Sequence, residues 1–203
     1  MKTILIHGLG QTSKSWDATL SHMKSEDILC PDLFGLLDGE VSYPALYSAF
    51  SDYCDQIEGS LSLCGLSLGA VLALQYAIGH PGKVNSLALI AAQYRMPKTL
   101  LRIQNLIFRF MPESKFEGIG PSKNDFIRLC RSTINLDFKK ELDSVKCPVL
   151  ILCGENDTAN KKASAELKEL LPDARLRIIE NSGHEVNADA PRELARALTE
   201  FFG

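Results

Sequence analysis

The chain has 203 residues, of which 45% are hydrophobic and 23% are charged, and its formal net charge is −3. This length suits one globular core and is short for two full domains. The slight negative charge argues against a nucleic-acid partner, and no apolar run reaches the roughly 20 residues that span a bilayer. The apolar run after Met1 is too short for a signal peptide. We therefore expect a cytoplasmic protein.

Apolar runs that predict strands alternate along the chain with segments of helical periodicity. This order is typical of a parallel sheet covered by helices on both faces, an α/β fold with about six strands. The predicted strands cover residues 2–7, 27–31, 60–65, 84–91, 148–153 and 175–180. The predicted helices cover residues 13–24, 43–58, 68–80, 159–171 and 188–202.

A glycine-rich loop follows the first predicted strand, with the sequence His7-Gly8-Leu9-Gly10. Such a loop lets backbone N–H groups point at a ligand without obstruction by side chains. The N–H of Leu9 is one candidate donor to an oxyanion. His7 has two possible roles, and a structural one within the loop is favoured over that of a second base.

The third predicted strand leads into Gly65-Leu66-Ser67-Leu68-Gly69, which precedes a helical pattern. In a strand–turn–helix of this kind the serine is held in a strained conformation that exposes its hydroxyl. A Cβ at either glycine would collide with a neighbouring element. Ser67 is therefore the candidate nucleophile, and the N–H of Leu68 is the second candidate oxyanion donor.

The stretch from about residue 93 to residue 144 breaks the alternation of strands and helices. It contains two helical patterns, at 97–110 and 122–136. Between Arg95 and Arg131 it carries eight basic and three acidic residues, a net charge of +5 that leaves −8 for the rest of the chain. A solvated helix face explains this charge. A sharper hypothesis is that one arginine points inward and binds an anionic substrate.

Loops after the last two predicted strands carry an acid and a base. One loop contains Glu155 and Asp157, and the other contains His184. The carboxyl ends of parallel strands are where an α/β sheet places its chemistry, so these side chains are expected near Ser67. His184 would accept the serine proton, and either acid could orient the imidazole.

The six cysteines favour buried free thiols over disulfides, and no pair has the spacing of a metal site. No metal and no cofactor are expected.

Together these segments closely resemble the α/β-hydrolase fold family. The resemblance covers nearly the whole chain and places Asp157 at the position of the family's acid. It implies a hydrolase core at 1–92 and 145–203, without the family's two N-terminal antiparallel strands, and a helical lid at 93–144. The apolar lid residues at 100, 101, 103, 106, 107 and 110 are expected to pack mainly onto this core.

The resemblance implies a serine esterase with the triad Ser67, Asp157 and His184, acting on a small-molecule acyl substrate through an acyl-enzyme. Thioesterase, lactonase, carbon–carbon hydrolase and aminopeptidase activities use the same machinery, and a slow or non-catalytic ligand receptor is the alternative outside the enzymes. The oligomeric state is left open. The candidate substrate-pocket residues are Trp16, Gln93, Tyr94, Phe108, Met111 and Val186.

Overall fold

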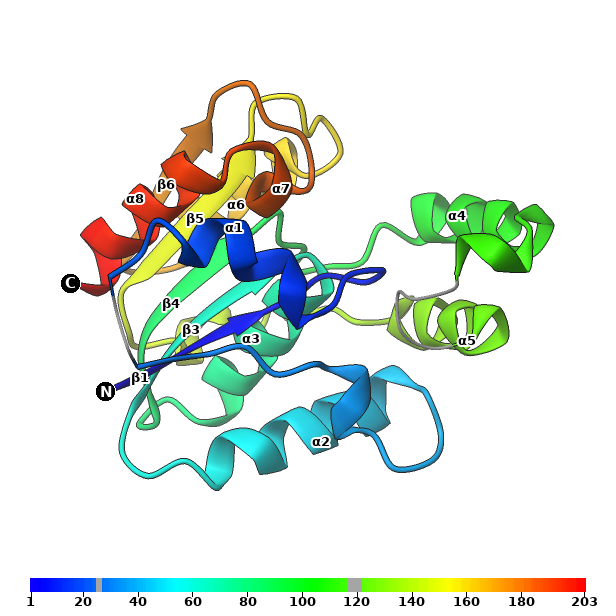
Figure 1. Cartoon of the computed structure of the whole chain (residues 1–203). Coiled ribbons are helices and arrows are strands. Elements are labelled where there is room, and N and C mark those ends of the chain that lie inside the picture. The colour runs from blue at the N-terminus through cyan, green and yellow to red at the C-terminus, as the bar shows by residue number, and fades with distance from the viewer. Residues whose placement is uncertain (25–26, 117–121) are drawn as a thin grey trace.

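The computed structural model describes residues 1–24, 27–116 and 122–203. Its centre is a six-stranded sheet with the order β2-β1-β3-β4-β5-β6, in which every neighbouring pair is parallel (Figure 1). The strands are β1 (Lys2–Ile6), β2 (Ile28–Leu29), β3 (Leu61–Leu66), β4 (Val84–Ile90), β5 (Val149–Gly154) and β6 (Ala174–Ile179). The predicted α/β fold with a parallel sheet of about six strands is confirmed.

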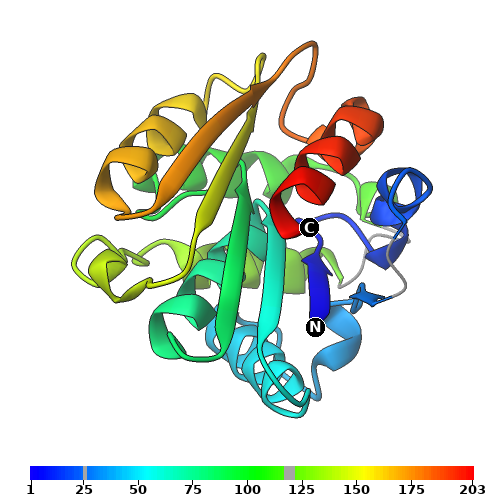
Figure 2. The ribbon, with the colours of Figure 1, turned by 90° about the vertical axis from the view of Figure 1, so that its left-hand side faces the viewer.

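Helices cover both faces of this sheet, as the two views show (Figures 1 and 2). One hydrophobic core joins the sheet to α2 (Tyr43–Asp55), α3 (Leu68–Gly79) and α6 (Lys161–Leu170). The other core joins the opposite face to α1 (Asp17–Leu20), α7 (Val186–Asp189) and α8 (Pro191–Phe202). Every residue of β3 and β5 is buried, which explains the continuous apolar sequence of β5 and the mostly apolar sequence of β3.

Two predicted helices are shorter than the sequence pattern indicates. In the predicted 13–24 segment the chain forms a 3-10 helix, Ser13–Trp16, and the four-residue α1. There the hydroxyls of Ser15 and Ser21 donate to backbone carbonyls three residues earlier, at 2.7 Å each, a type of bond that competes with regular helix. The predicted 188–202 helix is split at Ala190, because the residue before a proline avoids helical geometry.

The described residues between positions 93 and 144 connect β4 to β5, and this segment is called the insertion below. The insertion carries α4 (Lys98–Phe110), the 3-10 helices Glu113–Lys115 and Leu142–Ser144, and α5 (Lys123–Thr133). Figure 1 shows α4 and α5 standing away from the sheet, on the side where the strands end. No helix in the described ranges is long and apolar enough to cross a membrane.

Candidate active site

Ser67 lies in the turn between β3 and α3, with φ of 54° and ψ of −112°. A positive φ is uncommon for any residue other than glycine, and it marks the strain expected of an exposed nucleophile. The two flanking glycines are sterically required. A Cβ on Gly65 would lie 2.2 Å from the carbonyl oxygen of Gly69, and a Cβ on Gly69 would lie 2.2 Å from that of Ile6.

His184 and Asp157 come from the loops that follow β6 and β5. The His184 Nδ1 lies 2.9 Å from Oδ2 of Asp157, whose side chain is buried while the imidazole is partly exposed. The two loops can approach because β5 ends in Gly154, where a Cβ would lie only 2.0 Å from the carbonyl oxygen of Gly183. A carboxylate accepts only, so Nδ1 carries the proton and Nε2 remains available to accept one.

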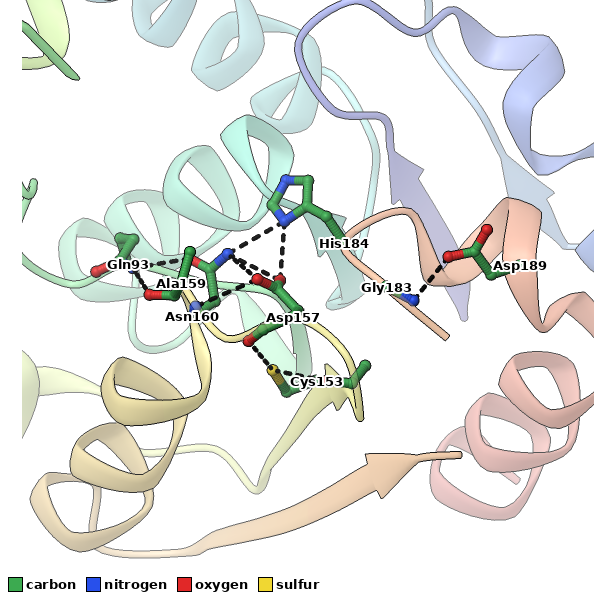
Figure 3. A network of polar contacts seen from close by, with 9 residues as sticks. Gln93, Cys153, Asp157, Ala159, Asn160, Gly183, His184 and Asp189 are labelled. Atoms are coloured by element: carbon green, nitrogen blue, oxygen red, sulfur yellow. Dashed lines mark hydrogen bonds and ion pairs between the residues drawn. The ribbon is translucent and has the colours of Figure 1, made fainter. Parts of the chain in front are cut away.

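Asn160 completes a chain of polar contacts around this pair (Figure 3). Its Nδ2 donates to both carboxylate oxygens of Asp157, at 2.9 and 2.8 Å, and lies 3.1 Å from the His184 Nδ1. The Oδ1 of Asn160 accepts from Nε2 of Gln93 at 2.7 Å. The buried carboxylate is therefore held from both sides, by an imidazole and by an amide that Gln93 fixes.

Two further acids near these loops accept hydrogen bonds from backbone N–H groups. The Glu155 carboxylate accepts from the N–H of Asn181 at 3.0 Å, and Asp189 accepts from the N–H of Gly183 at 2.7 Å. Glu155, the competing acid in the sequence analysis, therefore stabilises the turn that precedes His184. Asp189 holds the same loop from its other end (Figure 3).

His7 is fully buried in the glycine-rich loop. Its Nε2 accepts from the N–H of Leu33 at 3.0 Å, so Nδ1 carries the proton and donates to the carbonyl of Gly8 at 2.9 Å. Burial lowers the pKa of the imidazole. Both ring nitrogens are thus committed to backbone groups, which agrees with the structural role favoured from the sequence.

A cavity of about 390 Å³ opens between these loops and the insertion. Ser67, Asp157 and His184 all line it, as do both candidate oxyanion residues, Leu9 and Leu68. No hydrogen bond joins Ser67 to His184 in the described part of the chain. Most of the remaining wall is apolar, and it is formed by Val71, Ala91, Gln93, Met96, Pro97, Leu101, Gln104, Phe108, Phe126, Leu129, Cys130, Thr133, Ala159 and Asn160.

Of the six candidate pocket residues, the structure brings Gln93 and Phe108 to this wall. Trp16 and Val186 are fully buried in the core on the α8 face of the sheet, so the prediction that they contact substrate is not supported. Tyr94 is also buried, and its hydroxyl donates to Glu166 at 2.7 Å. Met111 packs against the aromatic cluster of Phe108, Phe116 and Phe126.

The wall of the cavity contains no lysine or arginine among the residues that the structure describes. The insertion's basic side chains instead lie mostly on its surface, including Arg102 and Arg109 of α4. The hypothesis of an inward arginine is therefore not supported.

The prediction that the apolar residues of the insertion pack mainly onto the core is partly wrong. Ile103, Leu106, Ile107 and Phe110 are each more than half exposed.

Most of the wall that α5 supplies, and the contacts of Asn160, are not predicted from the sequence. Phe126, Leu129 and Cys130 recur at helical spacing, a signal that finds the inner face of the helix but not the cavity beneath it. No group of three His, Cys, Asp or Glu side chains in residues 1–24, 27–116 and 122–203 is arranged to hold a metal ion.

Comparison with known proteins places this geometry in a family. Residues 3–197 match the model of the alpha/beta hydrolase family. The chain belongs to the alpha/beta hydrolase family. One family relative, from Escherichia coli O157:H7 (strain EC4115 / EHEC), is provisionally named carbamate hydrolase RutD. It is 23% identical over 229 residues, covering 93% of this chain and 86% of the relative.

Solved structures of this family have the same fold. An esterase from Thermogutta terrifontis superposes with a TM-score of 0.82 at 19% identity, covering 100% of this chain and 89% of that one. The enol-lactonase from Burkholderia xenovorans LB400 superposes with a TM-score of 0.86 at 16% identity, covering 99% of this chain and 91% of that one. At these identities the likeness concerns the fold, and the substrate has to be argued from the cavity itself.

Proposed function

We propose that this chain is a serine hydrolase that cleaves uncharged small-molecule carboxylic esters or closely related acyl compounds. The carrying observation is that one cavity is lined by Ser67 at positive φ and by a His184 whose Nδ1 is hydrogen-bonded to buried Asp157. This is the combination of an exposed hydroxyl, a base and an orienting acid that nucleophilic acyl transfer requires.

In the proposed reaction the Ser67 Oγ attacks the substrate carbonyl carbon while its proton passes to the His184 Nε2. Collapse of the tetrahedral intermediate breaks the bond to the leaving group, which takes the proton from His184 and departs. A water molecule then gives a proton to His184, attacks the acyl-enzyme and releases the carboxylic acid. Ser67 recovers its proton from His184, and Asp157 stabilises the transient imidazolium.

The backbone N–H groups of Leu9 and Leu68 are the proposed oxyanion donors. Both residues line the cavity beside Ser67, and Leu68 is the first residue of α3. The N-terminus of a helix favours negative charge, so the developing oxyanion would be stabilised there. Each such donor contributes about 3 kcal/mol to the transition state in well-studied hydrolases.

The cavity wall supports a preference for neutral, apolar acyl groups. Leu101 and Phe108 of α4 and Leu129 of α5 supply apolar surface, and no lysine or arginine lines the described wall. The insertion would thus act as a lid whose inner face selects the substrate. The relatives' names, which include an esterase, an enol-lactonase and a carbamate hydrolase, all fit cleavage beside a carbonyl carbon.

A panel of p-nitrophenyl esters, graded by acyl length and including one with a terminal carboxylate, tests this function. We expect turnover of the neutral esters, a value of kcat/KM at least about tenfold lower for the anionic ester, and no turnover by Ser67→Ala. Ser48→Ala, on the exposed side of α2, is the matched control and should keep full activity. Undiminished turnover by Ser67→Ala would refute the mechanism. Ligand binding without turnover by the unmodified protein would favour a receptor.

A further inference from the structure

Helix α4 presents an apolar face to the outside of the molecule. Ile103, Leu106, Ile107 and Phe110 are 53%, 53%, 54% and 83% exposed. Their spacing of three and four residues places all four on one side of the helix. An amphipathic helix of a globular protein ordinarily turns such a face toward the core. Here the face points away from it, on a part of the chain that stands off the sheet (Figure 1).

The inner face of the same helix is mixed, because it carries two amide side chains beside Leu101 and Phe108. Gln104 lines the cavity, and Asn105 is only 7% exposed. The Oδ1 of Asn105 is buried without a hydrogen-bond partner among the described residues. Four large apolar side chains of α4 therefore face outward while two amides face inward, which contact with water alone does not favour. The outward apolar face is therefore expected to contact a partner surface rather than water.

Basic side chains flank this face. Lys98, Arg102 and Arg109 are exposed and lie along one side of α4. A surface groove beside its C-terminal end is lined by Arg109, Glu113, Lys123, Asn124, Ile127, Arg128 and Arg131, which include four basic residues and one acidic residue. The sequence from Arg95 to Arg131 carries a net charge of +5, whereas the rest of the chain carries −8. The molecule is thus polarised, with its positive end at the insertion.

We propose that this surface of the insertion docks peripherally onto a lipid bilayer that contains anionic headgroups. Large apolar side chains on one side of a helix, bordered by lysine and arginine, are the combination that enters the interface of such a bilayer. A second copy of the chain fits less well, because a symmetric contact would bring two segments of charge +5 together. Since Leu101, Gln104 and Phe108 of α4 line the cavity, docking would bring the cavity wall close to the membrane surface.

Binding of the full-length protein to vesicles tests this proposal. The vesicles are phosphatidylcholine alone or phosphatidylcholine with about one third phosphatidylglycerol, at about 0.05 M and about 0.5 M salt. We expect cosedimentation with the anionic vesicles at low salt, strongly reduced at high salt and with the neutral vesicles. Ser67→Ala should bind as the unmodified protein does, so loss of catalysis and loss of docking are separable.

Two pairs of variants locate the docking surface. Leu106→Gln with Phe110→Gln should weaken binding at least about tenfold, whereas Ile178→Gln, at an exposed position of β6, should not change it. Arg102→Gln with Arg109→Gln should weaken it about 30-fold, whereas Arg192→Gln on α8 should not.

Three results would overturn the proposal. The first is no binding to anionic vesicles, and the second is equal binding to neutral ones. The third is a dimer in solution that Leu106→Gln with Phe110→Gln dissociates, since a second copy would then cover the face.

Discussion

The amide nitrogen of Asn160 lies 2.9 Å from one carboxylate oxygen of Asp157 and 2.8 Å from the other. The second of these oxygens is also 2.9 Å from the His184 Nδ1. Asn160 thus fixes the rotation of the carboxylate that orients the base. Gln93 donates a hydrogen bond to the Asn160 Oδ1. The fixed orientation of Asp157 and His184 therefore depends on a residue of the cavity wall.

Asn160→Ala is expected to lower kcat about tenfold with little change in KM, because the carboxylate would lose a donor and its fixed rotation. Asn160→Asp should be worse, because it sets a second carboxylate against Asp157. Steady-state kinetics on a neutral ester measures both changes, and Asn124→Ala, at an exposed position of α5, is the control. Activities of both Asn160 variants within twofold of the unmodified protein would show that Asn160 does not position the acid.

Asp157 and Glu155 lie two residues apart and should behave very differently. Asp157→Asn is expected to lower kcat about 10⁴-fold, because an amide that donates to Nδ1 forces the imidazole proton onto Nε2. Glu155→Gln removes only the charge from a bond to the N–H of Asn181, so kcat should stay within about threefold. A larger loss of kcat in Glu155→Gln than in Asp157→Asn would assign the acid to Glu155.

The glycines around Ser67 should be intolerant of any side chain. Gly65→Ala and Gly69→Ala would each place a Cβ 2.2 Å from a backbone carbonyl oxygen, so we expect at least about 2 kcal/mol of destabilisation. Gly82→Ala is the control, because its Cβ would meet no atom within 4 Å. Urea unfolding compares the three variants. Equal midpoints for Gly69→Ala and Gly82→Ala would contradict the tight packing of this turn.

His7 should make the stability depend on pH. Burial lowers the pKa of its imidazole in the folded protein, so the unfolded chain binds the extra proton first as the pH falls. The contribution of neutral His7 to the free energy of unfolding is complete above about pH 6.5, the ordinary pKa of a histidine side chain. This contribution is lost as the pH falls below that value. Urea midpoints at about pH 7.5 and about pH 5.5 should differ less in His7→Gln than in exposed His22→Gln. If the urea midpoint changes equally with pH in the two variants, His7 is not the source of the pH dependence.

Much of the fold could be predicted because its signals are local. A continuous apolar run predicts β5, and a mostly apolar run predicts β3; both strands are buried on both faces. Glycines two residues either side of Ser67 predict the turn between β3 and α3. Asp157 and His184 were found because each follows a strand. Their meeting at 2.9 Å follows from the parallel order of those strands.

The other features of the site could not be predicted, because they depend on contacts between residues that are far apart in the sequence. Asn160 has the same sequence context as any polar residue near a helix start, and only the approach of the two loops gives it a role. Trp16 and Val186 follow the expected loops but point into a core rather than the cavity. The periodicity of α4 defined an apolar face correctly, yet periodicity does not tell which way that face points.

Labelling with a fluorophosphonate followed by intact-mass measurement tests the central claim most directly, because the reagent reacts with a serine that a neighbouring base activates. The unmodified protein is expected to gain one adduct, which should be absent from Ser67→Ala and His184→Ala and present in Ser48→Ala. No adduct on the unmodified protein, or an adduct that persists in Ser67→Ala, would contradict the account of Ser67 as an activated nucleophile.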